Sequence, residues 1–167
     1  GAIDSRTEYL VILANDWGHW DDSYYFVLGE DEYYVENNLD INSMINLQVD
    51  MMLYYDADGQ LYSAVGADLD TPEEKNVSTL VLEHLASNEI LFSGPSNPVY
   101  VRGIINTPEG PMLIAANPIT QSIDYEPIVG TLVVGRYVDK TLIREFEDTT
   151  KLALDLKALG PEEIEYM

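Results

Sequence analysis

The feature that most constrains this chain is a regular stripe of apolar side chains near its N-terminus. Its members recur at alternating intervals of 3 and 4 residues: Leu10, Leu13, Trp17, Trp20, Tyr24 and Val27. That spacing places all of them on one face of an α-helix. It predicts a long amphipathic helix over about residues 4–28, whose aromatic face must be buried against a second layer of structure.

Strand signals dominate the chain after this helix. Residues 47–67 predict a β-hairpin that turns at Asp58-Gly59, a dipeptide that tight hairpin turns favour. Three further strands are expected at about residues 99–105, 112–119 and 128–138. We also expect Leu152, Leu154 and Leu156 to alternate along a final strand.

Further helices are predicted between these strands. One is expected over about residues 33–44 and another over 139–148. A third should begin at Pro72, which suits the first helical position, because Thr71 can cap the helix and Glu74 would complete a capping box. Its buried stripe would then be formed by Val77, Leu80, Val81 and Leu85.

The order of these elements predicts a single α+β domain over residues 1–167. We expect a five-stranded antiparallel sheet with helices on one side, in the layout of PAS-like sensor domains, with a core over about residues 45–158. A chain of 167 residues suits one domain with a substantial core.

Composition excludes several classes of function. Thirty acidic against eight basic residues give a net charge of −22, which disfavours binding to nucleic acids and to anionic membrane surfaces. The acidic excess fits either a solvated coat or a surface that binds cations or basic ligands. The absence of cysteine excludes thiolate nucleophiles and Cys-ligated zinc. No apolar run reaches the roughly 18 residues of a membrane span.

Four sequence motifs resemble those of the CHASE4 family of extracytoplasmic sensor domains. The first is "DWGHWDDSYYFV", in which Asp16, Trp17, Trp20, Asp21, Asp22, Tyr24 and Phe26 match the family's opening signature. The others are "YYDADGQLY", "MLIAANPIT" and "GTLVVGRYVD", in the expected order along nearly the whole chain. Gly18 departs from the alanine expected there, and it weakens the helix by about 1 kcal/mol. It indicates a kink or the close approach of another backbone.

The resemblance implies a fold and a function. Such domains are single Cache-like sensors, with a long N-terminal helix, that sit outside the cell membrane between two transmembrane segments. We therefore expect one span before residue 1 and another after residue 167, both outside this sequence. The full receptor would be a histidine kinase or a cyclic-di-GMP enzyme, and it would form a homodimer through the long helix. This domain itself would not be an enzyme.

The tryptophan motif is interpreted mainly as a structural fastener. Heptad positions place Asp21 beside the buried seam and Asp22 outward, so Asp21 should be partly buried and needs a donor. Arg136 and Arg102 are candidate partners, and backbone or tryptophan N–H groups are alternatives. The motif residues Trp17, Trp20, Asp21 and Tyr24 are also candidates for direct ligand contact.

Signals for catalysis or for a metal are weak. Asp21 and Asp22 diverge by one helical step and make a poor acid–base pair. The acidic clusters Asp56-Ala-Asp58-Gly59 and Asp68-Leu-Asp70 fit turns better than a calcium loop. We expect His19 to face solvent and His84 to follow the buried stripe of its helix, and no paired histidines exist to hold zinc. Asn76-Val77-Ser78 matches the N-glycosylation pattern, but it would lie inside a predicted helix. No catalytic residue, metal or cofactor is predicted.

A small-molecule pocket is the remaining functional prediction. PAS-like sheets bind ligands between one sheet face and the helices and loops that cover it. The candidate polar groups are Tyr62, Tyr100, Arg102, Asn117 and Arg136. The two arginines would favour an anionic ligand such as a carboxylate.

We therefore predict the ligand-sensing extracytoplasmic domain of a membrane receptor. The sensor would pass a small-molecule signal across the membrane by rearranging its helix against the sheet. Two alternatives stay open at this stage. One is a secreted adhesion module that holds calcium on its acidic surface, and the other is a small hydrolase with an acidic site.

Overall fold

The computed structural model describes residues 2–138, 142 and 162–166. The helices are α1 Ala2–Gly18, α2 Asp21–Val27, α3 Tyr34–Asn38, α4 Ile41–Leu47 and α5 Thr79–Ala86, with a short 3-10 helix η1 at Glu89–Leu91. The strands are β1 Met51–Asp56, β2 Leu61–Asp68, β3 Glu73–Glu74, β4 Val101–Thr107, β5 Gly110–Ile119, β6 Gly130–Tyr137 and β7 Glu162–Tyr166.

The strands form one sheet in the order β3-β2-β1-β6-β5-β4-β7, and neighbouring strands run antiparallel. The α+β class and the antiparallel sheet are confirmed. The strands expected at 99–105, 112–119 and 128–138 are β4, β5 and β6. Two edge strands extend the predicted five: β3 pairs with the end of β2, and β7 pairs with β4.

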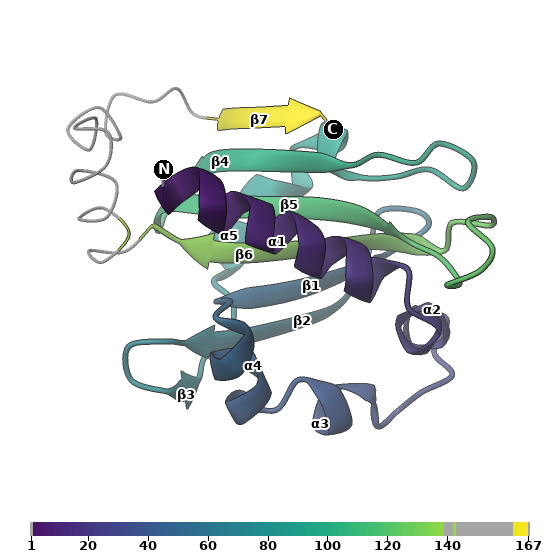
Figure 1. Ribbon diagram of the computed structural model, residues 1–167, viewed down its shortest axis with the longest axis horizontal. Coiled ribbons are helices and arrows are strands. Elements are labelled where there is room, and N and C mark those ends of the chain that lie inside the picture. Colours follow the sequence, from purple (N-terminus) through teal and green to yellow (C-terminus); the bar gives the residue numbers. More distant parts are fainter. Residues whose placement is uncertain (1, 139–141, 143–161, 167) are drawn as a thin grey trace.

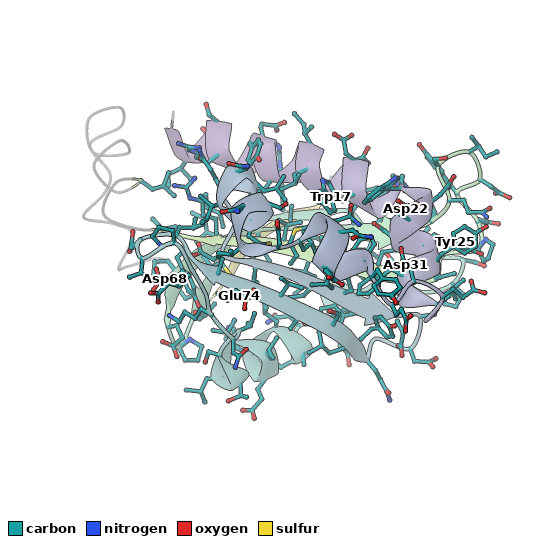
Figure 2. The ribbon with its side chains drawn as sticks, turned by 90° about the horizontal axis from the view of Figure 1, so that it is seen from below. Trp17, Asp22, Tyr25, Asp31, Asp68 and Glu74 are labelled. Atoms are coloured by element: carbon teal, nitrogen blue, oxygen red, sulfur yellow. The ribbon has the colours of Figure 1, made fainter. Side chains whose placement is uncertain are left out.

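Helices cover both faces of the sheet, whereas the sequence predicted helices on one face. α1 crosses one face over β5 and β6 (Figure 1), and Figure 2 shows α5 on the opposite side of the sheet. The central strands explain this difference. In β1, Met52 and Tyr54 join the core beneath α1, while Met51, Leu53 and Tyr55 join the core beneath α5. A strand that is apolar on both faces requires cover on both.

The expected N-terminal helix is broken into two. α1 ends at Gly18, and Trp20 is extended (φ −109°, ψ 130°) before α2 begins at Asp21. The break has a tertiary cause, because the carbonyl of the last helical residue is hydrogen-bonded to the segment after β5: Thr120 N donates to Gly18 O at 3.0 Å. A Cβ atom at position 18 would lie 2.7 Å from the Pro118 carbonyl oxygen, so glycine permits the contact. This confirms the predicted close approach of another backbone.

The single helix expected over about 33–44 is also divided, into α3 and α4. Asp40 separates them, since its carboxylate accepts a hydrogen bond from Ser43 N (2.9 Å) and caps the new helix. Gln48 closes α4 in the left-handed conformation, with φ 58°.

The β1–β2 hairpin turns at Asp58-Gly59 as predicted, but its loop is longer than a two-residue turn. Tyr55 pairs with Leu61, and the Asp56 carboxylate accepts hydrogen bonds from the backbone N–H groups of Asp58 and Gln60. Gly59 has φ +78°, a backbone conformation that glycine adopts without strain, and this explains why glycine occupies the position.

The helix predicted to start at Pro72, after the Thr71 cap, begins seven residues later, at Thr79. Residues Glu73–Glu74 instead form β3, and Lys75 N donates to Gly66 O on strand β2 (3.3 Å). A Cβ at Gly66 would lie 2.2 Å from Lys75 O, so this segment can lie so close alongside β2 only because position 66 lacks a side chain. Pairing with the sheet therefore overrides the local capping signal.

The register of the helical stripe shifts accordingly. Val81 and Leu85 are fully buried as predicted, whereas Leu80 is 54% exposed and Val77 lies before the helix. The helix expected over 139–148 and the strand expected at 152–156 lie outside the described residues, apart from the buried Leu142.

Candidate functional site

The tryptophan motif fastens α1 and α2 to the core. Trp17 and Trp20 lie edge to face, 5.4 Å between ring centroids, and both are partly buried against the apolar cluster beneath α1, as is Tyr24. Figure 2 shows Trp17 on α1 and Asp22 on α2. In this arrangement the two tryptophans are structural anchors.

The prediction that Asp21 is partly buried is wrong: the side chain is exposed. The break after Gly18 changes the helical phase, so Asp21 starts α2 instead of continuing the seam. Its carboxylate accepts a hydrogen bond from Ser122 N at 2.8 Å, in the loop that follows β5. Of the partners considered from sequence, the backbone N–H alternative is the one observed.

His19 is buried at the α1–α2 break, although the sequence predicted a solvent-facing side chain. Its Nδ1 lies 2.7 Å from Thr120 Oγ1 and its Nε2 lies 3.1 Å from the Tyr100 hydroxyl. The ring stacks on Tyr125, with centroids 4.3 Å apart and planes 11° apart. Burial lowers the pKa of His19.

The hydrogen-bond network fixes the tautomer of His19. Thr120 Oγ1 donates to Gln121 O at 2.8 Å, so it must accept from Nδ1–H of His19. Nε2 is then the acceptor for the Tyr100 hydroxyl. Neutral His19 thereby joins α1, the end of β5 and the segment that leads into β4.

Three of the five predicted pocket residues lie on the sheet face beneath α1. Arg102 on β4 forms an ion pair with Glu8 of α1. Asn117 on β5 accepts a hydrogen bond from Asn15 Nδ2 (3.4 Å), also on α1.

The third, Arg136 on β6, is 8% exposed and donates to Gln48 Oε1 (3.1 Å), which also accepts from Arg6 of α1 (2.7 Å). Arg102, Asn117 and Arg136 thus connect the sheet to α1 and to the end of α4.

The other two predicted pocket residues lie apart from these three. Tyr100 belongs to the His19 junction, where burial, and then the nearby Tyr125, raises the pKa of its hydroxyl. Tyr62 is 45% exposed on β2, with its ring edge to face with Phe26 at 5.1 Å. The structure does not gather the five around one cavity, and their role in ligand binding stays a prediction.

A hollow of about 280 Å³ lies on the sheet face opposite α1. Its apolar floor contains Met51 of β1 and Met112 of β5, and one wall is the segment from Leu69 to Ser78 that leads to α5. The two methionines cover the backbone of Gly135, where a Cβ would lie 2.6 Å from Met51 Cε and 2.7 Å from Met112 Sδ. Methionine side chains are adaptable, so this floor can adjust its shape to a ligand.

The rim of this hollow is predominantly acidic. Among the described residues that line it are the carboxylates of Asp50, Asp68, Asp70 and Glu109 and the ammonium group of Lys75. Asp68, which is labelled in Figure 2, is one of the residues that line the hollow, and the backbone N–H groups of Thr71 and Asp70 lower its pKa.

Polar groups beside the acids complete the rim. Asp50 accepts a hydrogen bond from Tyr137 N at 2.8 Å. Burial, and then the charges of Glu109 and Asp50, raises the pKa of the Tyr137 hydroxyl. The negative potential of this site favours a cationic group.

Strand directions explain why these acids meet. In the antiparallel sheet, the starts of β1 and β5 lie beside the ends of β2 and β6. Four strand ends therefore bring together Asp50, Asp68, Glu109 and Tyr137. The sequence pattern of Asp68-Leu-Asp70 predicts a turn, with a calcium site as the weaker alternative. The missed signal is the position of acidic residues at strand ends that antiparallel pairing places side by side.

The acidic clusters have turn geometry, as predicted. Asp68 accepts hydrogen bonds from Asp70 N and Thr71 N, much as Asp56 does in the hairpin. Within residues 2–138, 142 and 162–166, no three His, Asp or Glu side chains are grouped closely enough to hold a metal ion. In the same part of the chain, no helix is both long and apolar enough to cross a membrane.

Comparison with known proteins identifies the family. The CHASE4 domain matches residues 2–157. The chain is 34% identical over 148 residues to the methanogenesis regulatory histidine kinase FilI of Methanothrix harundinacea (strain 6Ac), covering 89% of this chain and 17% of that protein. The chain therefore spans about a sixth of the length of this relative.

A solved structure supports the fold. It is described as the extracellular domain of the histidine kinase vpHK1S-Z8, and it superposes with a TM-score of 0.51 at 12% identity, covering 81% of this chain and 53% of that one. With the family match along nearly the whole sequence, the resemblance seen in the tryptophan motif is confirmed: this chain is a sensor domain of the CHASE4 family.

Proposed function

We propose that this chain is the extracytoplasmic input domain of a membrane-bound histidine kinase. The family match over residues 2–157 carries the proposal. FilI is named as a histidine kinase, and the similar solved structure is described as an extracellular domain. Because the chain covers 17% of FilI, the spans and the kinase would lie in the remaining length of such a receptor.

The ligand site that we propose is the hollow opposite α1. Its acidic rim and methionine floor suit a small ligand with a cationic group and an apolar body, such as an amine. The anion expected from sequence relied on Arg102 and Arg136, which contact Glu8 and Gln48 beneath α1. A cation better matches the described lining of the hollow, in which carboxylates outnumber ammonium groups.

The signal would leave the domain through α1. This helix packs on β5 and β6, whose far faces carry Met112, Gly135 and Tyr137 at the hollow. A ligand that prefers one position of these strands against α1 would shift the receptor between its signalling states. The homodimer through the N-terminal helix, which the family resemblance implies, also stays a prediction.

Calorimetric titration of the purified domain tests the ligand site. Propylammonium and tetramethylammonium are suitable cationic probes, and propionate is the anionic counterpart. We expect saturable binding of at least one cation, with affinity reduced about tenfold or more by Asp70→Asn combined with Glu109→Gln. The matched control is Asp58→Asn, which neutralises a carboxylate in the β1–β2 loop and should leave affinity within twofold. Binding of propionate alone, or equal affinity in all variants, would refute this site.

A further inference from the structure

We propose that Asn76 is a site of N-linked glycosylation. The proposal rests on the extracytoplasmic location proposed above, because such modification occurs on the outer side of the membrane. Asn76-Val77-Ser78 is the single Asn-x-Ser/Thr sequence, with x other than proline, in the 167 residues. The sequence alone placed it inside a helix, where it would be a poor acceptor.

The structure places this tripeptide outside any helix or strand. β3 ends at Glu74 and α5 begins at Thr79, so the backbone from Lys75 to Ser78 has no repeating hydrogen bonds. Asn76 is exposed. A transferase must enclose its acceptor in an extended form, and a segment between two elements can be enclosed without unwinding a helix.

The neighbours of Asn76 hold the segment against the sheet while leaving this residue at the surface. Lys75 N donates to Gly66 O at 3.3 Å, and Val77 Cγ2 lies 3.0 Å from the position that a Cβ on Gly66 would occupy. Ser78 precedes α5, but its side chain makes no capping hydrogen bond to that helix. Its hydroxyl can therefore be recognised by an enzyme without destabilising α5.

The modification requires a glycosyl donor of the lipid-linked phosphate or pyrophosphate class. The Asn76 Nδ2 attacks the anomeric carbon of the sugar and forms a C–N bond. The bond between that carbon and the lipid phosphate oxygen breaks, and the phosphate leaves with its electron pair. One amide proton is released to balance the charge. Because Asn76 also lines the hollow opposite α1, the attached glycan would cover part of its rim and limit the size of the ligands that enter.

Mass spectrometry of the full-length receptor, purified from membranes of the cells that produce it, tests this inference. The peptide that contains Asn76 should carry a mass increment that fragments into sugar units. Asn76→Gln and Ser78→Ala should abolish the increment, whereas Ser78→Thr should retain it. Labelling the lysines of this domain in intact cells with a membrane-impermeant amine reagent reports its location independently.

The possible results distinguish failure of the glycosylation site from failure of the extracytoplasmic location. An unmodified Asn76 in a domain that is labelled from outside would overturn the glycosylation site and leave the sensor function intact. An unmodified Asn76 in a domain that is not labelled would overturn the extracytoplasmic location, and the glycosylation site with it. An increment that persists in Ser78→Ala would show a different modification and would also overturn the proposal.

Discussion

Gly18 at the end of α1 lies so close to Asn117 of β5 that a Cβ atom at position 18 would be 2.6 Å from Asn117 Nδ2. The backbone carbonyl of Pro118 would be nearly as close, at 2.7 Å, and it cannot rotate away as a side chain can. This contact fixes the point at which α1 stops.

The variant Gly18→Ala should therefore destabilise the domain. Alanine gains about 1 kcal/mol of helix propensity over glycine, but overpacking against a backbone atom costs about 1–3 kcal/mol or more. We expect a net loss in the free energy of unfolding, measured by urea denaturation. Gly94→Ala is the matched control, since a Cβ there would lie at an ordinary contact distance of 3.7 Å from Asn97 Cβ. A Gly18→Ala domain at least as stable as the wild type would contradict the assigned contact.

The hydroxyls of Ser23, Tyr34 and Tyr54 form a buried chain beneath α2, with 2.7 Å between successive oxygen atoms. Burial raises the pKa of Tyr34 to about 12. Tyr54→Phe should cost about 1 kcal/mol, because it removes one buried hydrogen bond. Tyr33→Phe, at a side chain 57% exposed, should change stability by less than about 0.5 kcal/mol. Thermal and urea unfolding of both variants measure these changes. Equal losses of stability in the two variants would refute a stabilising role for the buried hydroxyl network.

His19 should make stability depend on pH. Because burial lowers its pKa, the folded domain prefers neutral imidazole. The stabilisation should be fully present above the unfolded pKa of about 6.5 and should be lost as pH falls through the lower folded pKa. Unfolding free energies measured between pH 7.5 and 5 should decline less steeply in His19→Gln than in the wild type. Identical slopes would show that His19 does not couple folding to protonation.

Arg102 separates the two ideas about ligand charge. If its function is to pair with Glu8 on α1, Arg102→Gln should reduce stability by less than about 1 kcal/mol, as for a solvent-accessible ion pair. It should also leave cation binding unchanged in calorimetry. A loss of ligand affinity in this variant would instead support the pocket expected from sequence.

The strands were the most predictable part of this fold. The apolar run of β5 and the Asp58-Gly59 turn between β1 and β2 are local signals that tertiary contacts reinforce. The errors occurred where a distant backbone group competed with a local preference. The hydrogen bond from Thr120 N to the Gly18 carbonyl ends α1. Gly66 allows Lys75 to hydrogen-bond to β2, which replaces the helix expected after Thr71.

The candidate site was harder to predict because it depends on strand pairing. Alternation could show which neighbours Arg102 or Arg136 shares a face with inside its own strand, but it could not show that the two arginines share one face of the sheet or that α1 covers that face. Asp50 and Glu109 lie 59 positions apart in sequence. They come to the same end of the sheet only when β1, β6 and β5 pair. No pattern within a single segment contains that information.

The most direct test of the account measures autophosphorylation of the full-length receptor, reconstituted in vesicles with this domain accessible, while propylammonium or tetramethylammonium is titrated. We predict that a cation which binds the isolated domain changes the rate of autophosphorylation. The concentration for half the effect should rise about tenfold or more in Asp70→Asn with Glu109→Gln, and stay within twofold in Asp58→Asn. A rate that is insensitive to every cation bound by the domain, or a response unchanged in the double variant, would contradict the hollow opposite α1 as the sensory site.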